Sequence, residues 1–149
     1  MRWTPHATVA TIVERDGRFL LVEEHTSAQQ LVINQPAGHL EENESFTQAA
    51  IRETREETGW TVNPTALIGM YVYTAPSNGV TYHRYCFAAE AVSHDPDQPL
   101  DEGIQQAIWL SRDELIARTQ QLRSPMVIKC IDDYMAGQRF PLDFIVEQN

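Results

Sequence analysis

Cysteine is scarce in this sequence of 149 residues, which contains only Cys86 and Cys130, far apart and outside any Cys-x-x-Cys motif. Two cysteines cannot form a disulfide framework or a thiolate zinc site, so each is expected to be a small buried hydrophobic residue. The five histidines show no zinc-binding spacing, and no Gly-x-Ser-x-Gly motif or Cys–His pairing indicates a covalent nucleophile. Zinc enzymes and covalent hydrolases are therefore disfavoured.

Positive charge is also scarce, because 11 Lys and Arg residues stand against 21 Asp and Glu residues. The net charge of −10 and the single lysine, Lys129, argue against a long nucleic-acid partner. No apolar run is long enough to span a membrane, and the N-terminal residues lack the apolar segment of a signal peptide. We therefore expect a cytoplasmic protein without a membrane partner. An anionic substrate would be repelled by this acidic chain unless bound cations lay between them.

Alternating hydrophobic residues predict strands over residues 6–13, 18–24, 31–33, 67–74, 80–91 and 104–110. Asp16 and Gly17 predict a tight turn between the first two of these strands. Residues 37–44 and 94–103 are predicted loops because they are rich in acidic residues and contain glycine or proline. Together with the helices below, this pattern predicts one α+β domain over residues 1–149, with helices on the faces of a mixed sheet.

The first two helices are predicted from their end signals. Ser45 and Gln48 form a capping box, and Gly59 is a typical helix stop, so the first helix spans residues 46–58. A second capping box, at residues 111–114, opens a short second helix.

A third helix begins at Ser124 and Pro125, which are typical of the first positions of a helix, and ends at Gly137. Its apolar side chains recur at helical spacing, which favours core packing over a ligand site. The residues of this stripe are Val127, Ile131, Tyr134 and Met135.

Three glutamates of the first predicted helix, Glu53, Glu56 and Glu57, lie within one turn on one face. Like charges at this spacing destabilise a helix by roughly 0.2–0.5 kcal/mol per pair. By itself such a cluster is most simply a solvated acidic face. The same carboxylates would also bind Mg²⁺ or Mn²⁺, which prefer oxygen ligands.

The residues around these glutamates have a fixed spacing that favours the second interpretation. Gly38 is followed by Glu44 after five residues, by Arg52 and Glu53 after seven more, and then by Glu56, Glu57 and Gly59. Seven such positions would match by chance on the order of once in a million chains of this composition. The pattern resembles the Nudix box, a loop–helix–loop that binds divalent metal and diphosphate. The resemblance covers nearly the whole chain and implies the Nudix fold, in which a mixed sheet lies between helices in α/β/α layers.

The resemblance also implies roles for the box residues. Glu53, Glu56 and Glu57 correspond to metal ligands, the Gly38 carbonyl to a further ligand, and Mg²⁺ or Mn²⁺ to the cofactor. Arg52 resembles the box arginine that orients the glutamates through ion pairs.

The box departs from the family pattern at one position, and the resemblance leaves two sources for the general base. Thr54 occupies a position that is aliphatic in the family, so we expect a slightly more polar underside of the helix. Family members take their general base from the box or from a later loop. Asp101 and Glu102 are the later-loop candidates, with Glu102 assigned as catalytic, and solvated loop charges are the alternative.

Motifs outside the box, over residues 34–41, 122–125 and 137–142, resemble a phosphatase branch of the family. Members of this branch act on nucleoside tri- and diphosphates and on a thiamine-precursor pyrimidine diphosphate, and they release orthophosphate. Four residues are candidates for substrate binding, namely Asn34, Gln35, Arg84 and Arg123. The alternatives are that the two amides only cap the turn before Pro36 and that the two arginines make ordinary surface contacts.

The leading hypothesis is therefore a metal-dependent hydrolase with a small nucleotide or diphosphate substrate. Cleavage of nucleoside diphosphates linked to another group, such as ADP-ribose or dinucleoside polyphosphates, is one alternative. A Nudix domain that senses a nucleotide without cleaving it is another, although the complete set of box glutamates disfavours it. A monomer and a homodimer are both compatible with the sequence.

Overall fold

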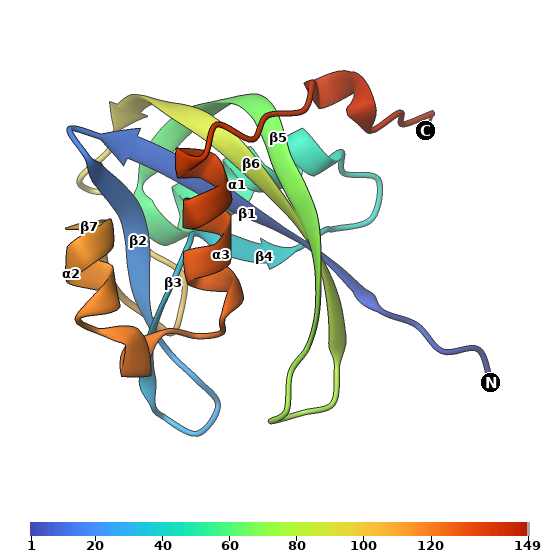
Figure 1. The fold of residues 1–149 in the computed structure, drawn as a ribbon, viewed down its shortest axis with the longest axis horizontal. Helices are drawn as coiled ribbons and strands as arrows, with labels where there is room; N and C mark the ends of the chain where they lie inside the picture. The colour runs from blue at the N-terminus through green and yellow to red at the C-terminus, as the bar shows by residue number, and fades with distance from the viewer. Residues whose placement is uncertain (149) are drawn as a thin grey trace.

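The structure is a computed structural model that describes residues 1–148 (Figure 1). Its strands are β1 (His6–Arg15), β2 (Arg18–His25), β3 (Leu31–Asn34), β4 (Ala37–His39), β5 (Trp60–Thr74), β6 (Thr81–His94) and β7 (Ile104–Ser111). Its α-helices are α1 (Phe46–Thr58), α2 (Arg112–Ile116) and α3 (Met126–Met135), and two 3₁₀ helices span Thr119–Gln121 and Leu142–Phe144.

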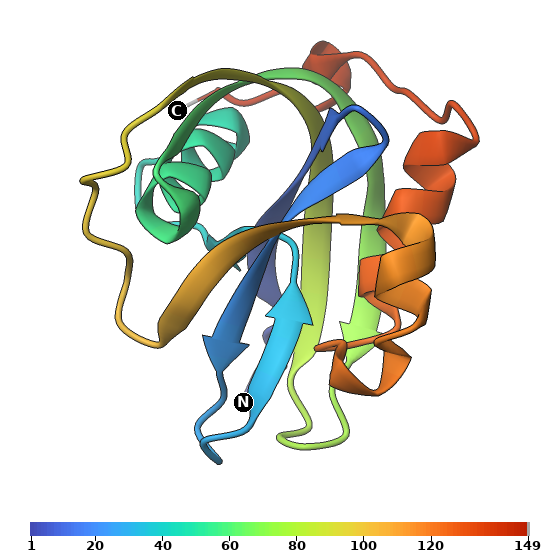
Figure 2. The same ribbon diagram turned by 90° about the vertical axis from the view of Figure 1, so that its left-hand side faces the viewer.

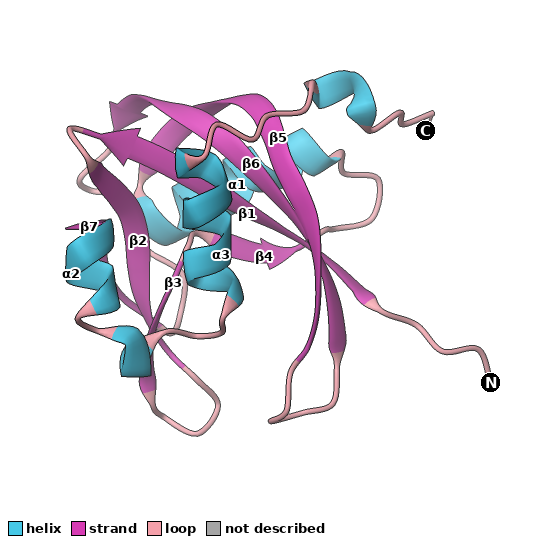
Figure 3. Ribbon diagram, viewed as in Figure 1, coloured by secondary structure: helices cyan, strands magenta, loops and turns pink. Residues whose placement is uncertain are grey.

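The strands form a mixed sheet in the order β3-β2-β1-β6-β5, and β4 and β7 pair with β1 and β2 outside this path. Strands β1 and β6 are parallel, and the other pairs are antiparallel (Figure 3). Figure 2 shows α1 on one side of the strands and α2 and α3 on the other. The predicted α+β class with α/β/α layers is confirmed.

Strand β1 supplies side chains to both sides of the sheet because successive residues of a strand point to opposite faces. On one face Val9 lies in a core cluster with Ala49 and Ala50 of α1. On the other face Ala10 lies in a cluster with Cys130 of α3. Both cysteines are buried, as expected from the sequence. No helix within residues 1–148 has the length and apolar character needed to cross a bilayer.

Helix α1 has the predicted boundaries. The Ser45 hydroxyl accepts from the Gln48 N–H at 3.1 Å, and the Gln48 side chain accepts from the Ser45 N–H at 2.9 Å. Gly59 adopts φ +77° and ends the helix, in the left-handed conformation that glycine adopts without strain. Thr54 is fully buried and donates to the Ala50 carbonyl at 2.8 Å, so the polar underside expected here is satisfied locally.

Helix α3 begins one residue later than predicted, at Met126, but Ser124 still caps it because its hydroxyl accepts from the Met126 N–H at 3.1 Å. The apolar stripe is only partly confirmed. Val127 and Ile131 are fully buried, whereas Met135 is 57% exposed because it lies in the last turn, beyond the edge of the core.

Two strand predictions were wrong. Residues 37–39, predicted as part of a loop, form β4 and pair with β1. Strand β5 begins directly after α1 at Trp60 and includes Pro64, where the prediction placed a break. Proline is tolerated there because β5 is an edge strand whose register shifts between Pro64 and Ala66.

Candidate active site

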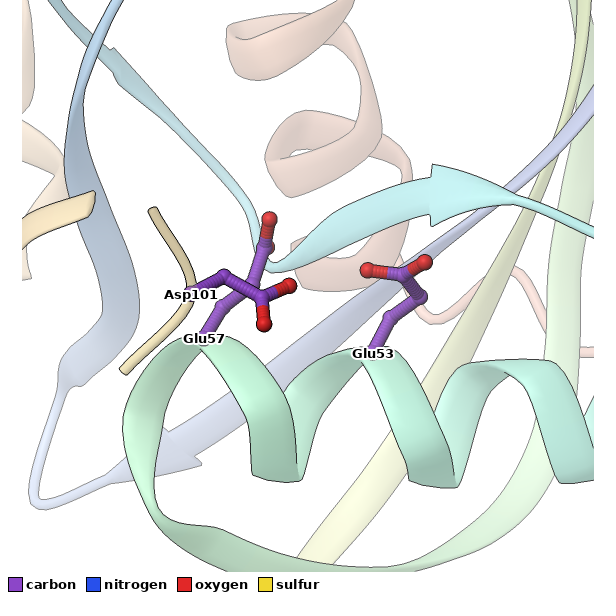
Figure 4. A group of neighbouring side chains, drawn as sticks. All are labelled: Glu53, Glu57 and Asp101. Carbon is purple, nitrogen blue, oxygen red and sulfur yellow. The ribbon is translucent and has the colours of Figure 1, made fainter. Parts of the chain in front are cut away.

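A group of three carboxylates lies where α1 meets the loop before β7. Glu53 and Glu57 project from α1 one turn apart, and Asp101 reaches toward them from the loop (Figure 4). One carboxylate oxygen of each residue lies within 4.8 Å of the other two. The Asp101 N–H donates to the Glu56 carbonyl at 2.9 Å, which anchors the loop to the helix. The one-turn spacing of Glu53 and Glu57, together with the loop's hydrogen bond to α1, brings the three side chains close to one another.

Strand β4 passes close against the same carboxylates. The Ala37 N–H donates to Glu57 Oε1 at 2.9 Å. A Cβ atom added to Gly38 would overlap the carboxylate of Glu53, so only glycine permits this approach. The backbone of β4 is therefore held within reach of any cation bound by Glu53 and Glu57.

Arg52 organises the carboxylates of α1 and of the loop before it. Its guanidinium donates to both oxygens of Glu44, at 2.6 and 2.9 Å, and to Glu53 and Glu56 at 2.9 and 3.0 Å. It also donates to the His39 carbonyl at 3.1 Å, which ties α1 to β4. The ion pairs expected for Arg52 are thus formed with Glu44 and Glu56 alike. The hydrogen bond from Arg52 lowers the pKa of Glu44, and that pairing raises the pKa of Arg52.

Burial has the opposite effect on the converging carboxylates. It raises the pKa of Glu57 from 4.5 to about 9, although the Ala37 N–H partly offsets the shift. Burial likewise raises the pKa of Glu53, and the pKa of Asp101 is raised by burial and by repulsion from Glu56. A bound cation would relieve this desolvation and repulsion. The donor set of converging carboxylate oxygens suits a hard divalent ion such as Mg²⁺ or Mn²⁺.

The structure separates residues that looked alike in the sequence. Glu56 was expected to share the metal site, but within residues 1–148 it pairs with Arg52 and is not a member of the converging group. Both loop candidates are exposed, but Asp101 joins Glu53 and Glu57, while Glu102 lies outside the group found among residues 1–148. No sequence signal distinguishes two adjacent acids, because the hydrogen bond from the Asp101 N–H to the Glu56 carbonyl of α1 decides which of them lies beside Glu53 and Glu57.

A pocket of about 500 Å³ adjoins Gly38 of β4. Three of the four predicted substrate-binding residues, Asn34, Arg84 and Arg123, line it. Other residues that line it, and that the sequence did not single out as binding residues, include Thr8, Glu24, His39 and Tyr82. These residues carry no local signal because they come together only through strand pairing.

Gln35 requires a correction, since it does not line the pocket and is fully buried. Its Oε1 accepts from Arg84 at 2.6 Å, and its Nε2 donates to the Val127 carbonyl at 2.8 Å. Both ends of the amide are therefore used inside the protein, and Gln35 positions Arg84 instead of contacting a bound molecule. The alternative of an ordinary surface role does not hold for Arg84, because this residue is only 7% exposed.

Comparisons with known proteins agree with this geometry. The NUDIX domain family model matches residues 3–130. The chain is 42% identical to Phosphatase NudJ of Escherichia coli K12 over 145 residues, which cover 97% of this chain and 93% of that protein. The same values hold for Phosphatase NudJ of Shigella boydii.

A solved structure described as a NUDIX hydrolase from Nitrosomonas europaea matches with a TM-score of 0.95 and 48% identity. The match covers 97% of this chain and 98% of that chain. The resemblance to the phosphatase branch seen in the outer motifs is thus confirmed by similarity to Phosphatase NudJ. The chain belongs to the Nudix family and is a hydrolase.

Proposed function

We propose that the chain is a divalent-metal-dependent hydrolase of nucleoside tri- and diphosphates, or of related small diphosphates, that releases orthophosphate. The observation that carries the proposal is the convergence of Glu53, Glu57 and Asp101 against Gly38, beside a pocket lined by Arg84. Similarity to proteins named phosphatase supports orthophosphate release over pyrophosphate release. The net charge of −10 supports a small substrate over a long nucleic acid.

The residues of the box fit a divalent cation. Glu53, Glu57 and the Gly38 carbonyl would hold Mg²⁺ or Mn²⁺, with Glu56, placed beside them by Arg52, as a further ligand. Such an ion neutralises phosphoryl oxygens and lowers the pKa of a water molecule that attacks phosphorus.

The chain must also accept the proton that the attacking water loses when it forms the new bond to phosphorus. Asp101 suits this role because its carboxylate lies beside Glu53 and Glu57, and burial raises its pKa, which strengthens it as a proton acceptor. Glu102, the neighbouring residue, is the alternative acceptor. The bond from the attacked terminal phosphorus to the bridging oxygen breaks as the new bond forms, and that oxygen leaves with the nucleoside diphosphate, so that GTP would give GDP and orthophosphate.

Hydrolysis of GTP in ¹⁸O-labelled water tests both parts of the proposal. We expect transient GDP before GMP and label in orthophosphate. Turnover should stop in EDTA and return with Mg²⁺ or Mn²⁺. Pyrophosphate as the sole inorganic product would refute orthophosphate release and favour cleavage of the inner bond. Activity that survives thorough chelation would refute the metal requirement, and binding of nucleotides without turnover of any would favour a sensor.

A further inference from the structure

Two arginines line the pocket, and their electrostatic surroundings differ. Arg123 pairs with Glu24 at 2.9 Å, so its charge is balanced. Arg84 is 7% exposed, and no carboxylate within residues 1–148 lies within 4.0 Å of its nitrogens. Its Nε is buried and lacks a hydrogen-bond partner among the described residues. A buried guanidinium without a counter-charge is rare in proteins because its desolvation is costly.

The neighbours of Arg84 hold it in place without neutralising it. Its Nη2 donates to Asn34 Oδ1 at 3.2 Å and to Gln35 Oε1 at 2.6 Å. These amides are themselves fixed, because Asn34 donates to Glu24 at 3.4 Å and Gln35 donates to the Val127 carbonyl at 2.8 Å. The guanidinium is therefore oriented in advance, and its positive charge remains available to a ligand in the pocket.

The start of α3 adds a second positive feature to the same pocket. Helix α3 covers the part of the sheet face that includes Ala10, but its first residue, Met126, lines the pocket beside Thr8 and Arg84. The N-terminal end of a helix carries partial positive charge that favours anions. The uncompensated guanidinium thus indicates an anionic ligand, and the partial charge of the nearby helix end has the same sign.

The pairing of the strands relates Arg84 to the carboxylate group. Thr8 of β1 lies opposite Arg84 of β6, and the next residue, Val9, lies opposite Gly38 of β4. Arg84 and Gly38 are therefore two strand spacings apart, which corresponds to about 10 Å between their backbones. Arg84 projects from the sheet face opposite to α1, because its partner Thr8 precedes Val9, which faces α1. The pocket is lined by both Arg84 and Gly38, so a polyphosphate chain in it can contact Arg84 and approach the carboxylates beside Gly38.

We propose that Arg84 binds the phosphoryl group of the substrate that is not attacked, and thereby sets which phosphorus faces Glu53, Glu57 and Asp101. The inference rests on the proposed function, because it assigns a register to the substrate of that same site. It also explains why the two arginines differ: Arg123 closes the pocket wall with Glu24, and Arg84 receives the substrate's charge.

Binding of inorganic pyrophosphate in EDTA, measured by calorimetry, tests the anion site without metal or turnover. We expect Arg84→Gln to weaken binding about ten- to a hundredfold, as for the loss of a hydrogen bond to a charged group. Arg84→Lys should weaken it less, because the charge remains while the planar fork is lost. Arg18→Gln, which removes one exposed arginine at the far end of β2, is the control with the same change in net charge and should bind as the wild type does.

The outcomes separate anion binding from other roles of Arg84. Equal pyrophosphate binding by wild type and Arg84→Gln, or no binding by the wild type, would overturn the proposal. Binding of guanosine that depends on Arg84, without such binding of pyrophosphate, would also overturn it and make Arg84 a reader of the base. Thermal unfolding of each variant checks folding, and Arg84→Lys serves as the test if Arg84→Gln does not fold.

Product analysis with GTP tests the register. The wild type should release orthophosphate, and Arg84→Gln should release an added fraction of pyrophosphate because the phosphate chain can shift. An unchanged product ratio in Arg84→Gln would overturn the register assignment. If the wild type itself released only pyrophosphate, the proposed orthophosphate release would fail, whereas pyrophosphate binding in EDTA that depends on Arg84 would still support the anion site.

Discussion

Arg52 and Arg84 are the same residue type near the same site, but their surroundings are opposite. Arg52 has a side chain that is 21% exposed and pairs with Glu44, Glu53 and Glu56. Arg84 is more deeply buried and, within residues 1–148, contacts only amide oxygens through its hydrogen bonds. Arg52 therefore stabilises the arrangement of the protein without ligands, while Arg84 keeps an unbalanced charge.

The carboxylates show the same contrast with the opposite sign. The pKa of Glu44 is lowered because Arg52 donates to it, whereas burial raises the pKa of Glu57 to about 9. Two kinds of ionisable group without sufficient counter-charge therefore lie near the same site: the carboxylates of Glu53 and Glu57 on α1, and the guanidinium of Arg84 on β6. Groups whose charges are poorly compensated tend to mark functional sites. The comparison predicts that altering balanced groups changes stability, and altering unbalanced groups changes ligand binding or catalysis.

The strongest test of this comparison is Glu57→Gln. We expect kcat to fall a few hundredfold, more than the roughly ten- to hundredfold typical of residues that only support a ligand, because the shape is kept and the charge is lost. The metal-free variant should be at least as stable as wild type, since it no longer buries an ionisable group. Steady-state kinetics with Mg²⁺ and thermal unfolding in EDTA measure the two effects. A decrease in kcat below tenfold would make Glu57 a bystander.

The neighbouring acids Asp101 and Glu102 provide a matched pair. Asp101→Asn should lower kcat about a hundredfold, the lower range for loss of a general base, because Asp101 faces Glu53 and Glu57. Glu102→Gln should leave kcat within about twofold, as is common for exposed positions. Metal affinity measured alongside kcat separates loss of the base from loss of the cation. A large kcat decrease in Glu102→Gln with intact metal affinity would instead assign the base to Glu102.

The two arginines can be compared directly through stability in EDTA. Arg52→Gln should lower the free energy of unfolding by about 2 kcal/mol, because it leaves Glu44, Glu53 and Glu56 facing one another without a cation. Arg84→Gln should change it by less than about 1 kcal/mol, because an unpaired buried charge is removed. Urea unfolding followed by circular dichroism gives both values. Equal destabilisation by the two substitutions would make Arg84 a structural residue.

The last prediction concerns pH. Because the pKa of Glu57 is about 9 in the folded protein and 4.5 ordinarily, the metal-free protein should lose stability as pH rises from 4.5 toward 9. Cation binding should release a proton near neutral pH, so Mn²⁺ affinity should rise by at most about tenfold per pH unit in this range. Calorimetry in two buffers of different ionisation enthalpy measures the released proton. Glu57→Gln should flatten both trends, and a pH-independent affinity in wild type would contradict the prediction.

Local sequence patterns were enough to predict α1, its two ends and the spacing of its carboxylates. The capping box of Ser45 and Gln48, the stop at Gly59 and the spacing of Glu53 and Glu57 all act within a few residues. For the same reason the box could be identified, and with it the family and the layered fold. Helix ends and helix faces depend on hydrogen bonds and side chains three or four positions apart, which a single sequence displays directly.

Only the tertiary structure decided which distant residues complete the site. Asp101 joins Glu57 from a loop 44 positions later, because its N–H meets the Glu56 carbonyl. Arg84 and Gln35 become buried partners through the pairing of β1 with β6 and the packing of α3, neither of which leaves a local pattern. The sequence by itself determined the helix, its carboxylates and the family, because these follow from short-range periodicity. Burial and long-range strand pairing, which set the charge balance of Arg84, required the folded chain.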